Sequence, residues 1–147
     1  MTQANQEELK NAISHLIDHT DSKVNPFSLS TLTLDGYPAV RMMGIFFRDG
    51  LELYLNSQAP SGKLEQIKQN PKVSLFFHAP DYSEMITYFG QANLVEDPTE
   101  RAWAWERFPE AIKRYHTGPD SEKLAIIRIR PDRIEWTDRK TVSTFRP

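Results

Sequence analysis

The chain has 147 residues, 39% of them hydrophobic and 26% charged, which suits one ordinary globular domain with a sizeable core. Its formal net charge of −2 gives no support to a strongly basic, nucleic-acid-binding protein. The lack of cysteine excludes disulfide scaffolds, thiolate zinc sites, iron–sulfur clusters and a cysteine nucleophile. No apolar run resembles a signal peptide or a membrane span, and we therefore expect a cytoplasmic protein that does not cross a membrane.

The first half of the sequence predicts one helix followed by strands. Apolar residues at helical spacing predict an N-terminal helix within residues 1–20. From Phe27 the apolar period becomes two, which predicts a strand that ends at the hairpin signal Asp35-Gly36. Further strands are expected at 37–47 and 51–55.

The second half predicts two more helical segments and further strands. Ser61 is placed to cap a short helix that stops before Pro71. Strands are expected at 73–78 and 85–95, and a helix from Asp97 to about residue 116 with an interruption at a proline. Two last segments have β character, at 124–129 and 134–136.

Six or seven strands in hairpin order favour a mainly β fold, a small antiparallel barrel with flanking helices. A parallel sheet would need a helix after nearly every strand. We expect a single domain over 1–147, with the barrel core at 27–136 and a C-terminal tail at 137–147.

A series of short motifs runs through the predicted barrel in a fixed order. They lie at 36–43, 53–57, 61–66, 70–77, 90–92 and 130–136. This series resembles the pyridoxamine 5′-phosphate oxidase-like family of FMN-binding split barrels, and it looks most like the short branch that includes general stress protein 26. The resemblance implies a split β-barrel, FMN as cofactor, and a homodimer with FMN at the subunit interface.

Three residues that match the family's phosphate ligands are Arg41, Ser57 and Lys63. Arg41 lies within an apolar run, where an unpaired charge is costly unless it has a ligand or reaches solvent at the barrel rim. Lys63 stands in the first turn of the short helix, whose free N–H groups favour an anion. An arginine fork, a lysine and a hydroxyl suit the phosphate of FMN, which carries about two negative charges.

The resemblance also implies weaker contacts around the same stretch. The backbone at Met42 and Met43 would run along the isoalloxazine ring, although one of the two side chains is expected to pack in the core because strand residues alternate. Asn56, Ser61 and Gln66 are candidate polar contacts, and Gln66 would equally suit a solvated helix face.

Trp136 and Arg146 match family residues that approach the flavin from the neighbouring subunit. Trp136 would also suit a structural core aromatic. An aromatic cluster, Trp103, Trp105 and Phe108, would either line the flavin pocket or pack a helix on the barrel.

Departures from the family's pattern concern the vitamin B6 substrate. Positions that carry charged or polar groups in genuine pyridoxamine phosphate oxidases are here Phe46, Gly62, Met85, Val142 and Thr144. Phe and Val cannot hold a phosphate dianion. The resemblance therefore implies that FMN binding is retained and vitamin B6 oxidation is lost.

The expected function is that of an FMN-dependent oxidoreductase with a small-molecule electron donor or acceptor, such as NAD(P)H, and with no catalytic acid or base assigned. Alternatives are a non-catalytic flavin-binding or stress-response protein, and a relative that uses F420 or haem. His116, the last histidine, lies far from the C-terminus, which argues against haem. His15 and His19 are four residues apart, but no metal site is expected there because no carboxylate partner is evident.

Overall fold

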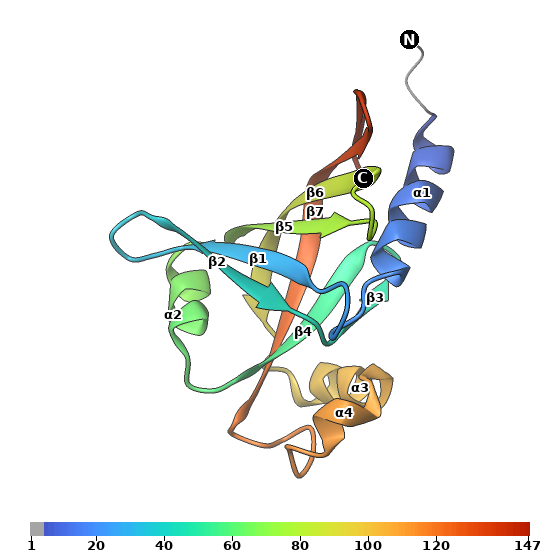
Figure 1. The fold of residues 1–147 in the computed structure, drawn as a ribbon. Helices are drawn as coiled ribbons and strands as arrows, with labels where there is room; N and C mark the ends of the chain where they lie inside the picture. The colour runs from blue at the N-terminus through green and yellow to red at the C-terminus, as the bar shows by residue number, and fades with distance from the viewer. Residues whose placement is uncertain (1–4) are drawn as a thin grey trace.

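The computed structural model describes residues 5–147, which form one antiparallel sheet of eight strands with four helices around it (Figure 1). The helices are α1 (Gln6–Asp18), α2 (Gly62–Gln69), α3 (Pro98–Arg107) and α4 (Glu110–Lys113). The strands are β1 (Phe27–Leu32), β2 (Pro38–Met43), β3 (Phe46–Asp49), β4 (Glu52–Gln58), β5 (Lys72–His78), β6 (Glu84–Leu94), β7 (Leu124–Asp138) and β8 (Thr141–Phe145).

The sheet curls into a half-barrel. Its strand order is β2-β1-β5-β6-β7-β4-β3, and β8 pairs with β7 beside this path. The β1–β2 hairpin projects to one side above α2, α1 lies on the opposite side, and α3 with α4 lies below (Figure 1). The mainly β, split-barrel fold class is thereby confirmed.

Two hydrophobic clusters hold the elements together. The larger fills the inside of the barrel, where the alternating residues of β1, β4 and β5 meet α1 and α2. The smaller lies on the other face of β4 and β7 and packs against α3 and α4. In this smaller cluster the rings of Phe47 and Tyr54 are stacked, and the rings of Trp103 and Phe108 pack against them at an angle. The ring centroids are 4.8–5.7 Å apart. Helix packing on the barrel thus accounts for most of the aromatic cluster of α3.

The strand predicted at 37–47 is divided in the structure. It ends at Met43, and β3 begins at Phe46 after a break at Gly44. A Cβ atom on Gly44 would lie 2.5 Å from the Cβ of Ser22 and 2.7 Å from its Cα. This close approach of the loop before β1 is what the sequence pattern alone did not indicate.

The two segments predicted at 124–129 and 134–136 are one continuous strand, β7. The register with β6 shifts between Phe89 and Gly90, where Gly90 pairs with Pro131 and Phe89 with Arg133. The extra residue on β7 is a β-bulge, one of the few places at which a sheet accepts proline.

The expected tail at 137–147 is also different. It contains the end of β7 and the strand β8, in which Ser143 and Phe145 are buried and pair back onto β7. Among residues 5–147 no helix is long and apolar enough to cross a membrane.

Candidate functional site

Arg41, Ser57 and Lys63 come from three elements and meet beside the start of α2. Arg41 lies on β2, opposite Leu29 of β1 and on the inner face of the hairpin. Ser57, near the end of β4, is buried, and its Oγ accepts a hydrogen bond of 2.9 Å from Lys63 Nζ. The three residues predicted to hold a phosphate are therefore brought together.

Two further polar side chains complete this group, which we call the cation cluster: Arg41, Lys63, Ser57, Gln66 and Thr31. Arg41 Nη1 donates to Thr31 Oγ1 at 2.9 Å, and Arg41 Nη2 lies 3.4 Å from Gln66 Oε1. Thr31 Oγ1 in turn donates to Gln66 Oε1 at 2.5 Å. The sequence analysis missed Thr31; its signal was a hydroxyl on the otherwise apolar inner face of β1, after Phe27 and Leu29.

The cation cluster carries two positive charges with no carboxylate. None of the ion pairs formed within residues 5–147 includes Arg41 or Lys63. Burial and then the nearby charge of Arg41 lower the pKa of Lys63 below its ordinary value. Burial likewise lowers the pKa of Arg41. Two partly desolvated cations held side by side are an arrangement that a bound anion stabilises.

The N-terminus of α2 adds neutral donors to the same region. Ser61 is the N-cap residue, as predicted, but its side chain makes no capping hydrogen bond. Its Oγ is buried and has no hydrogen-bond partner within the described chain. Free N–H groups at the start of a helix favour an anion. Ser61, however, lines the cavity that lies against Leu64 and Lys68 of α2, so that its contact with a phosphate in the cation cluster stays a prediction.

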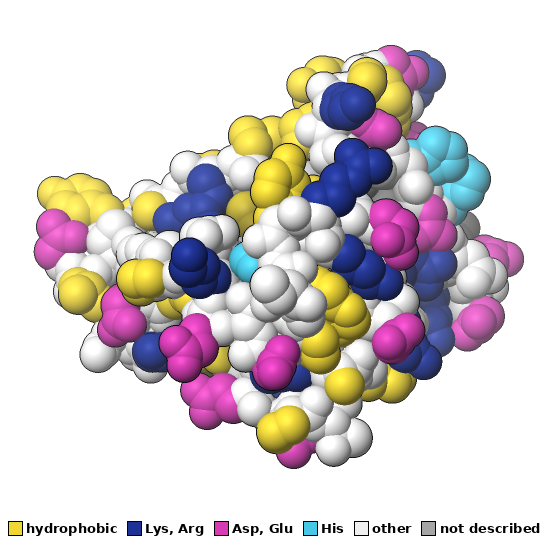
Figure 2. Space-filling view, turned by 90° about the horizontal axis from the view of Figure 1, so that it is seen from below, with side chains coloured by type: hydrophobic (Ala, Val, Ile, Leu, Met, Phe, Trp, Pro, Cys, Tyr) yellow, Lys and Arg dark blue, Asp and Glu magenta, His cyan; other side chains and the backbone are white. Residues whose placement is uncertain are grey.

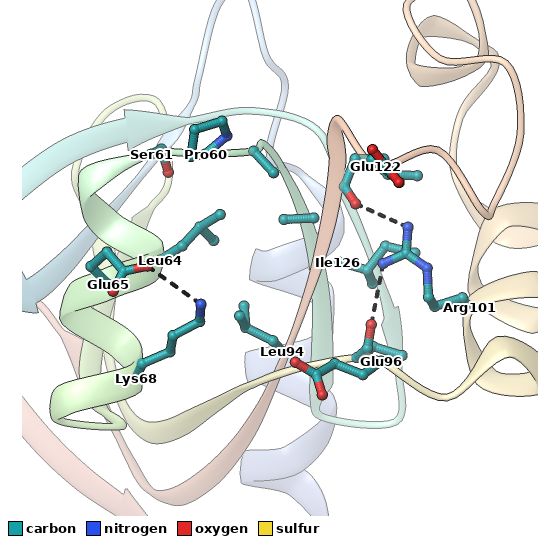
Figure 3. Close-up of a pocket in the computed structure, with 14 residues that line it drawn as sticks. Pro60, Ser61, Leu64, Glu65, Lys68, Leu94, Glu96, Arg101, Glu122 and Ile126 are labelled. Carbon is teal, nitrogen blue, oxygen red and sulfur yellow. Dashed lines mark hydrogen bonds and ion pairs between the residues drawn. The ribbon is translucent and has the colours of Figure 1, made fainter.

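A separate cavity of about 360 Å³ lies against α2, lined by Leu64, Glu65 and Lys68 among others (Figure 3). On the helix these residues face away from Lys63 and Gln66. The cations at this cavity already have partners: Lys68 pairs with Glu65, and Arg101 donates to four backbone carbonyls. Most N–H groups of Arg101 are therefore already used, whereas Arg41 in the cation cluster donates only to Thr31 and Gln66.

The strand residues predicted to contact the cofactor more weakly, Met42, Met43 and Asn56, lie on different faces of their strands. Met42 is 61% exposed on the outer face of β2, whereas Met43 packs against the barrel core. Asn56 is half-buried and pairs with Ile126, so that its side chain lies on the opposite face of β4 from Ser57. Its part in a binding site stays a prediction.

Trp136 and Arg146 lie away from the cation cluster of the same chain. Trp136 is in β7, opposite Ile86, and packs against the core, but its buried Nε1 has no hydrogen-bond partner in the described chain. Arg146 follows β8, and its backbone N donates to Gln6 Oε1 at the start of α1. The chain's C-terminus lies beside α1, across the barrel from α2 (Figure 1).

His15 on α1 and His19 at the C-cap of that helix pack against each other. The rings of His15 and His19 lie edge to face with centroids 4.4 Å apart, and His19 Nδ1 contacts the His15 carbonyl. In the described part of the chain no three histidine or carboxylate side chains gather to hold a metal ion.

Comparison with known proteins places this architecture in a family. The family model described as pyridoxamine 5'-phosphate oxidase matches residues 10–138. General stress protein 26 of Bacillus subtilis (strain 168) is 28% identical over 133 residues, which cover 88% of this chain and 89% of that protein. The structure of General Stress Protein 26 from Bacillus anthracis str. Sterne has a TM-score of 0.76 at 26% identity and covers 95% of this chain and 99% of its own.

Two structures of lower identity share the fold and differ in ligand. A pyridoxamine 5'-phosphate oxidase-related, FMN-binding protein from Nostoc punctiforme PCC 73102 has a TM-score of 0.69 at 17% identity and covers 100% of this chain and 99% of its own. A heme-binding protein from Mycobacterium smegmatis has a TM-score of 0.75 at 18% identity; it covers 99% of this chain, which spans 60% of that protein. Since the family model covers the cation cluster and nearly the whole sheet, this chain belongs to the pyridoxamine 5'-phosphate oxidase family.

Proposed function

We propose that this protein binds FMN and acts as an FMN-dependent oxidoreductase. The observation that carries the proposal is the pair Arg41 and Lys63, partly buried side by side with the hydroxyl of Ser57 and without a carboxylate. A dianionic phosphate would neutralise both cations and accept hydrogen bonds from their remaining N–H groups. Bound FMN would supply hydride or electron transfer, while the protein supplies binding and orientation.

The protein's own groups suit holding the cofactor better than acid–base chemistry. Arg41, Ser57 and Lys63 would fix the phosphate, and the backbone at Met42 and Met43 would continue from Arg41 along the ring. Within residues 5–147, the titratable side chains of the cation cluster are the two cations, Arg41 and Lys63. We therefore assign no catalytic acid or base and expect the electron donor or acceptor to be a small molecule such as NAD(P)H.

We further propose that the protein forms a homodimer with FMN in the seam. The edge strand β2 carries Arg41 on its inner face, whereas Val40 and Met42 on its outer face are 66% and 61% exposed. Leu34 and Tyr37 at the hairpin tip are similarly exposed, and hydrophobic side chains gather where this hairpin projects, at the left of Figure 2. An apolar surface next to a phosphate site supports an interface there, with Trp136 and Arg146 supplied by the partner.

Pyridoxamine 5′-phosphate is not the proposed substrate. Phe46 packs among the rings of Phe27 and Phe77, Val142 is 54% exposed, and neither supplies a charge. The protein should therefore not oxidise pyridoxamine 5′-phosphate faster than free FMN does under the same conditions. Formation of pyridoxal phosphate well above that background would contradict this prediction.

The test of the proposed function is a titration of the purified protein with FMN and with riboflavin, which lacks the phosphate. FMN should bind much more tightly, with the flavin absorbance bands of the bound cofactor. Equal affinity for the two flavins would contradict a phosphate site in the cation cluster.

Two alternatives would give different outcomes in the same preparation. A haem-loaded protein would show a Soret band, in line with the heme-binding relative, and F420 would be told from FMN by the mass of the released cofactor. A bound flavin that neither NADH nor NADPH reduces, and that no small-molecule acceptor reoxidises, would favour the non-catalytic flavin-binding protein.

A further inference from the structure

Thr31 is a buried hydroxyl at the centre of the cation cluster. It is 2% exposed and lies on the inner face of β1, opposite Ala39. Arg41 is two residues along β2 from Ala39, and so it is the diagonal neighbour of Thr31 across the hairpin. The hydroxyl bonds both Arg41 and Gln66, and it therefore links the hairpin to α2.

The direction of each hydrogen bond follows from the groups themselves. A guanidinium has only donors, and Thr31 Oγ1 must therefore accept from Arg41 Nη1. The proton of Thr31 is then free to go to Gln66 Oε1, which also lies near Arg41 Nη2. Gln66 thus turns its amide oxygen toward the guanidinium and keeps its amide NH₂ for other partners. The three side chains form a closed ring of contacts.

We propose that Thr31 is a positioning residue that, together with Gln66, holds the Arg41 guanidinium beside Lys63 in the orientation that receives a phosphate. This inference rests on the proposed FMN site. Arg41 and Lys63 repel each other, and no carboxylate in residues 5–147 pairs with either. Two neutral acceptors hold the guanidinium in place without cancelling its charge, so that the site is preorganised for an anion.

Gln66 accordingly has a different role from the direct polar contact with the cofactor that the sequence suggested. Its oxygen repels a phosphate, but the same oxygen accepts from Thr31 and faces Arg41. Only two of the five guanidinium N–H groups are used by Thr31 and Gln66, and the others remain for a ligand.

The experiment compares Thr31→Val, which keeps the shape of the side chain and removes the hydroxyl, with the matched control Thr31→Ser, which keeps the hydroxyl. Dissociation constants for FMN and riboflavin are measured by flavin fluorescence for both variants and the wild type. Thr31→Val should weaken FMN binding about tenfold or more, the effect expected for a lost hydrogen bond to a charged group. Riboflavin binding should stay within about twofold, because only the phosphate needs the oriented guanidinium. Thr31→Ser should restore most of the preference for FMN.

The outcomes separate this inference from the proposed function. If the wild type binds FMN and riboflavin equally, the phosphate site itself is wrong. If the wild type prefers FMN and Thr31→Val keeps the full preference, Thr31 does not position Arg41. An equal loss for both flavins would show a general packing role and would also overturn the inference. Should Thr31→Val fail to fold, Gln66→Leu on the half-buried face of α2 tests the same ring of contacts with the same two flavins.

Discussion

Arg41 and Lys63 are unusual because their surroundings disfavour their charges. Most arginine and lysine side chains in folded proteins reach water or a carboxylate, and both alternatives remove the cost of desolvation. Here the hydrogen-bond partners are the hydroxyls of Thr31 and Ser57 and the amide of Gln66. A bound phosphate would offset the cost of burying these two charges. That gain in binding free energy is the physical basis of the proposed specificity for FMN.

The first prediction concerns Arg41. Arg41→Ala should weaken FMN binding by about 2–4 kcal/mol, the usual loss when one partner of a partly buried charge pair is removed. The exposed Arg114, which follows α4, provides a matched control, and Arg114→Ala should leave the affinity unchanged. Titration of the apo-proteins with FMN measures both effects. An unaltered dissociation constant for Arg41→Ala would exclude Arg41 as a phosphate ligand.

The lowered pKa of Lys63 predicts how the stability of the apo-protein depends on pH. Burial and Arg41 place the pKa of Lys63 in the folded state below its ordinary value of 10.5. Between these two values the unfolded chain binds the proton that the folded chain has released, and this group therefore makes stability rise with pH. Urea unfolding of the wild type and of Lys63→Met, in the absence of flavin, should show this alkaline contribution only for the wild type.

The same group gives FMN affinity the opposite dependence. A phosphate beside Lys63 restores the charged form, so that binding takes up a proton and weakens as the pH rises above the lowered pKa. Lys63→Arg keeps its charge at every accessible pH and should remove this decrease. Riboflavin, titrated in parallel, corrects for ionisation of the ring. A wild-type profile that matches Lys63→Arg would contradict the assignment.

At the scale of elements, β2 connects the site to the proposed interface. The alternation of a strand puts Arg41 on the inner face and its neighbours Val40 and Met42 on the outer face. α2 carries a similar division, with Lys63 and Gln66 toward the cluster and Lys68 toward the separate cavity. Only one face of β2 and one face of α2 therefore contribute side chains to the cation cluster.

Gly44 lies where β2 gives way to β3, and its packing predicts a stability effect. A Cβ there would meet the backbone as well as the side chain of Ser22, and Gly44→Ala should cost about 1–3 kcal/mol through overpacking. Gly62, at the start of α2, has open space around its Cβ position, and Gly62→Ala is the matched control that should cost nothing. Urea unfolding compares the two variants, and equal midpoints would show that the loop before β1 moves aside.

Local patterns in the sequence predicted the elements well wherever the cause is local. The Asp35-Gly36 turn, with Gly36 at φ +91°, and the cap position of Ser61 are examples. The break at Gly44 depends instead on a segment more than twenty residues away, and the continuity of β7 through Pro131 depends on its bulge against β6. The same limit applies to the site: Arg41, Ser57 and Lys63 followed from motifs, whereas the hydroxyl of Thr31 gained its meaning from the hairpin register that puts it next to Arg41.

At the scale of the molecule, two halves of the predicted flavin site lie on different sides of one chain. The cation cluster is at α2, whereas Trp136 lies far along β7, opposite Ser143 of β8, and Arg146 is bonded to the start of α1. A single chain therefore does not bring all predicted ligands to one place, whereas an isologous dimer has two equivalent seams that would do so. Under this arrangement the cofactor contacts both subunits and stabilises their association.

The effect of FMN on dimerisation tests this linkage. A ligand that binds the dimer and not the separated chains adds RT ln(1 + [L]/Kd) per site to dimer stability, about 2.7 kcal/mol at a hundredfold excess over Kd. FMN should therefore lower the dimer dissociation constant, and riboflavin at the same concentration should do so less. Light scattering over a dilution series, with each flavin, measures the effect. A wild-type monomer that keeps one FMN per chain would contradict the bridging arrangement.

Removal of Arg146 and Pro147 examines the partner's contribution in the same assay. The buried Phe145 and the pairing of β8 with β7 stay in place, and the truncated protein should therefore fold, with a free energy of unfolding within about 0.5 kcal/mol of the wild type. Loss of one charged ligand should nevertheless weaken both FMN affinity and FMN-dependent dimerisation. Pro147→Ala is the control, since it changes the end of the chain and keeps Arg146. If the truncated protein matches this control in both measurements, Arg146 does not reach the flavin, and the seam must be completed by Trp136 alone.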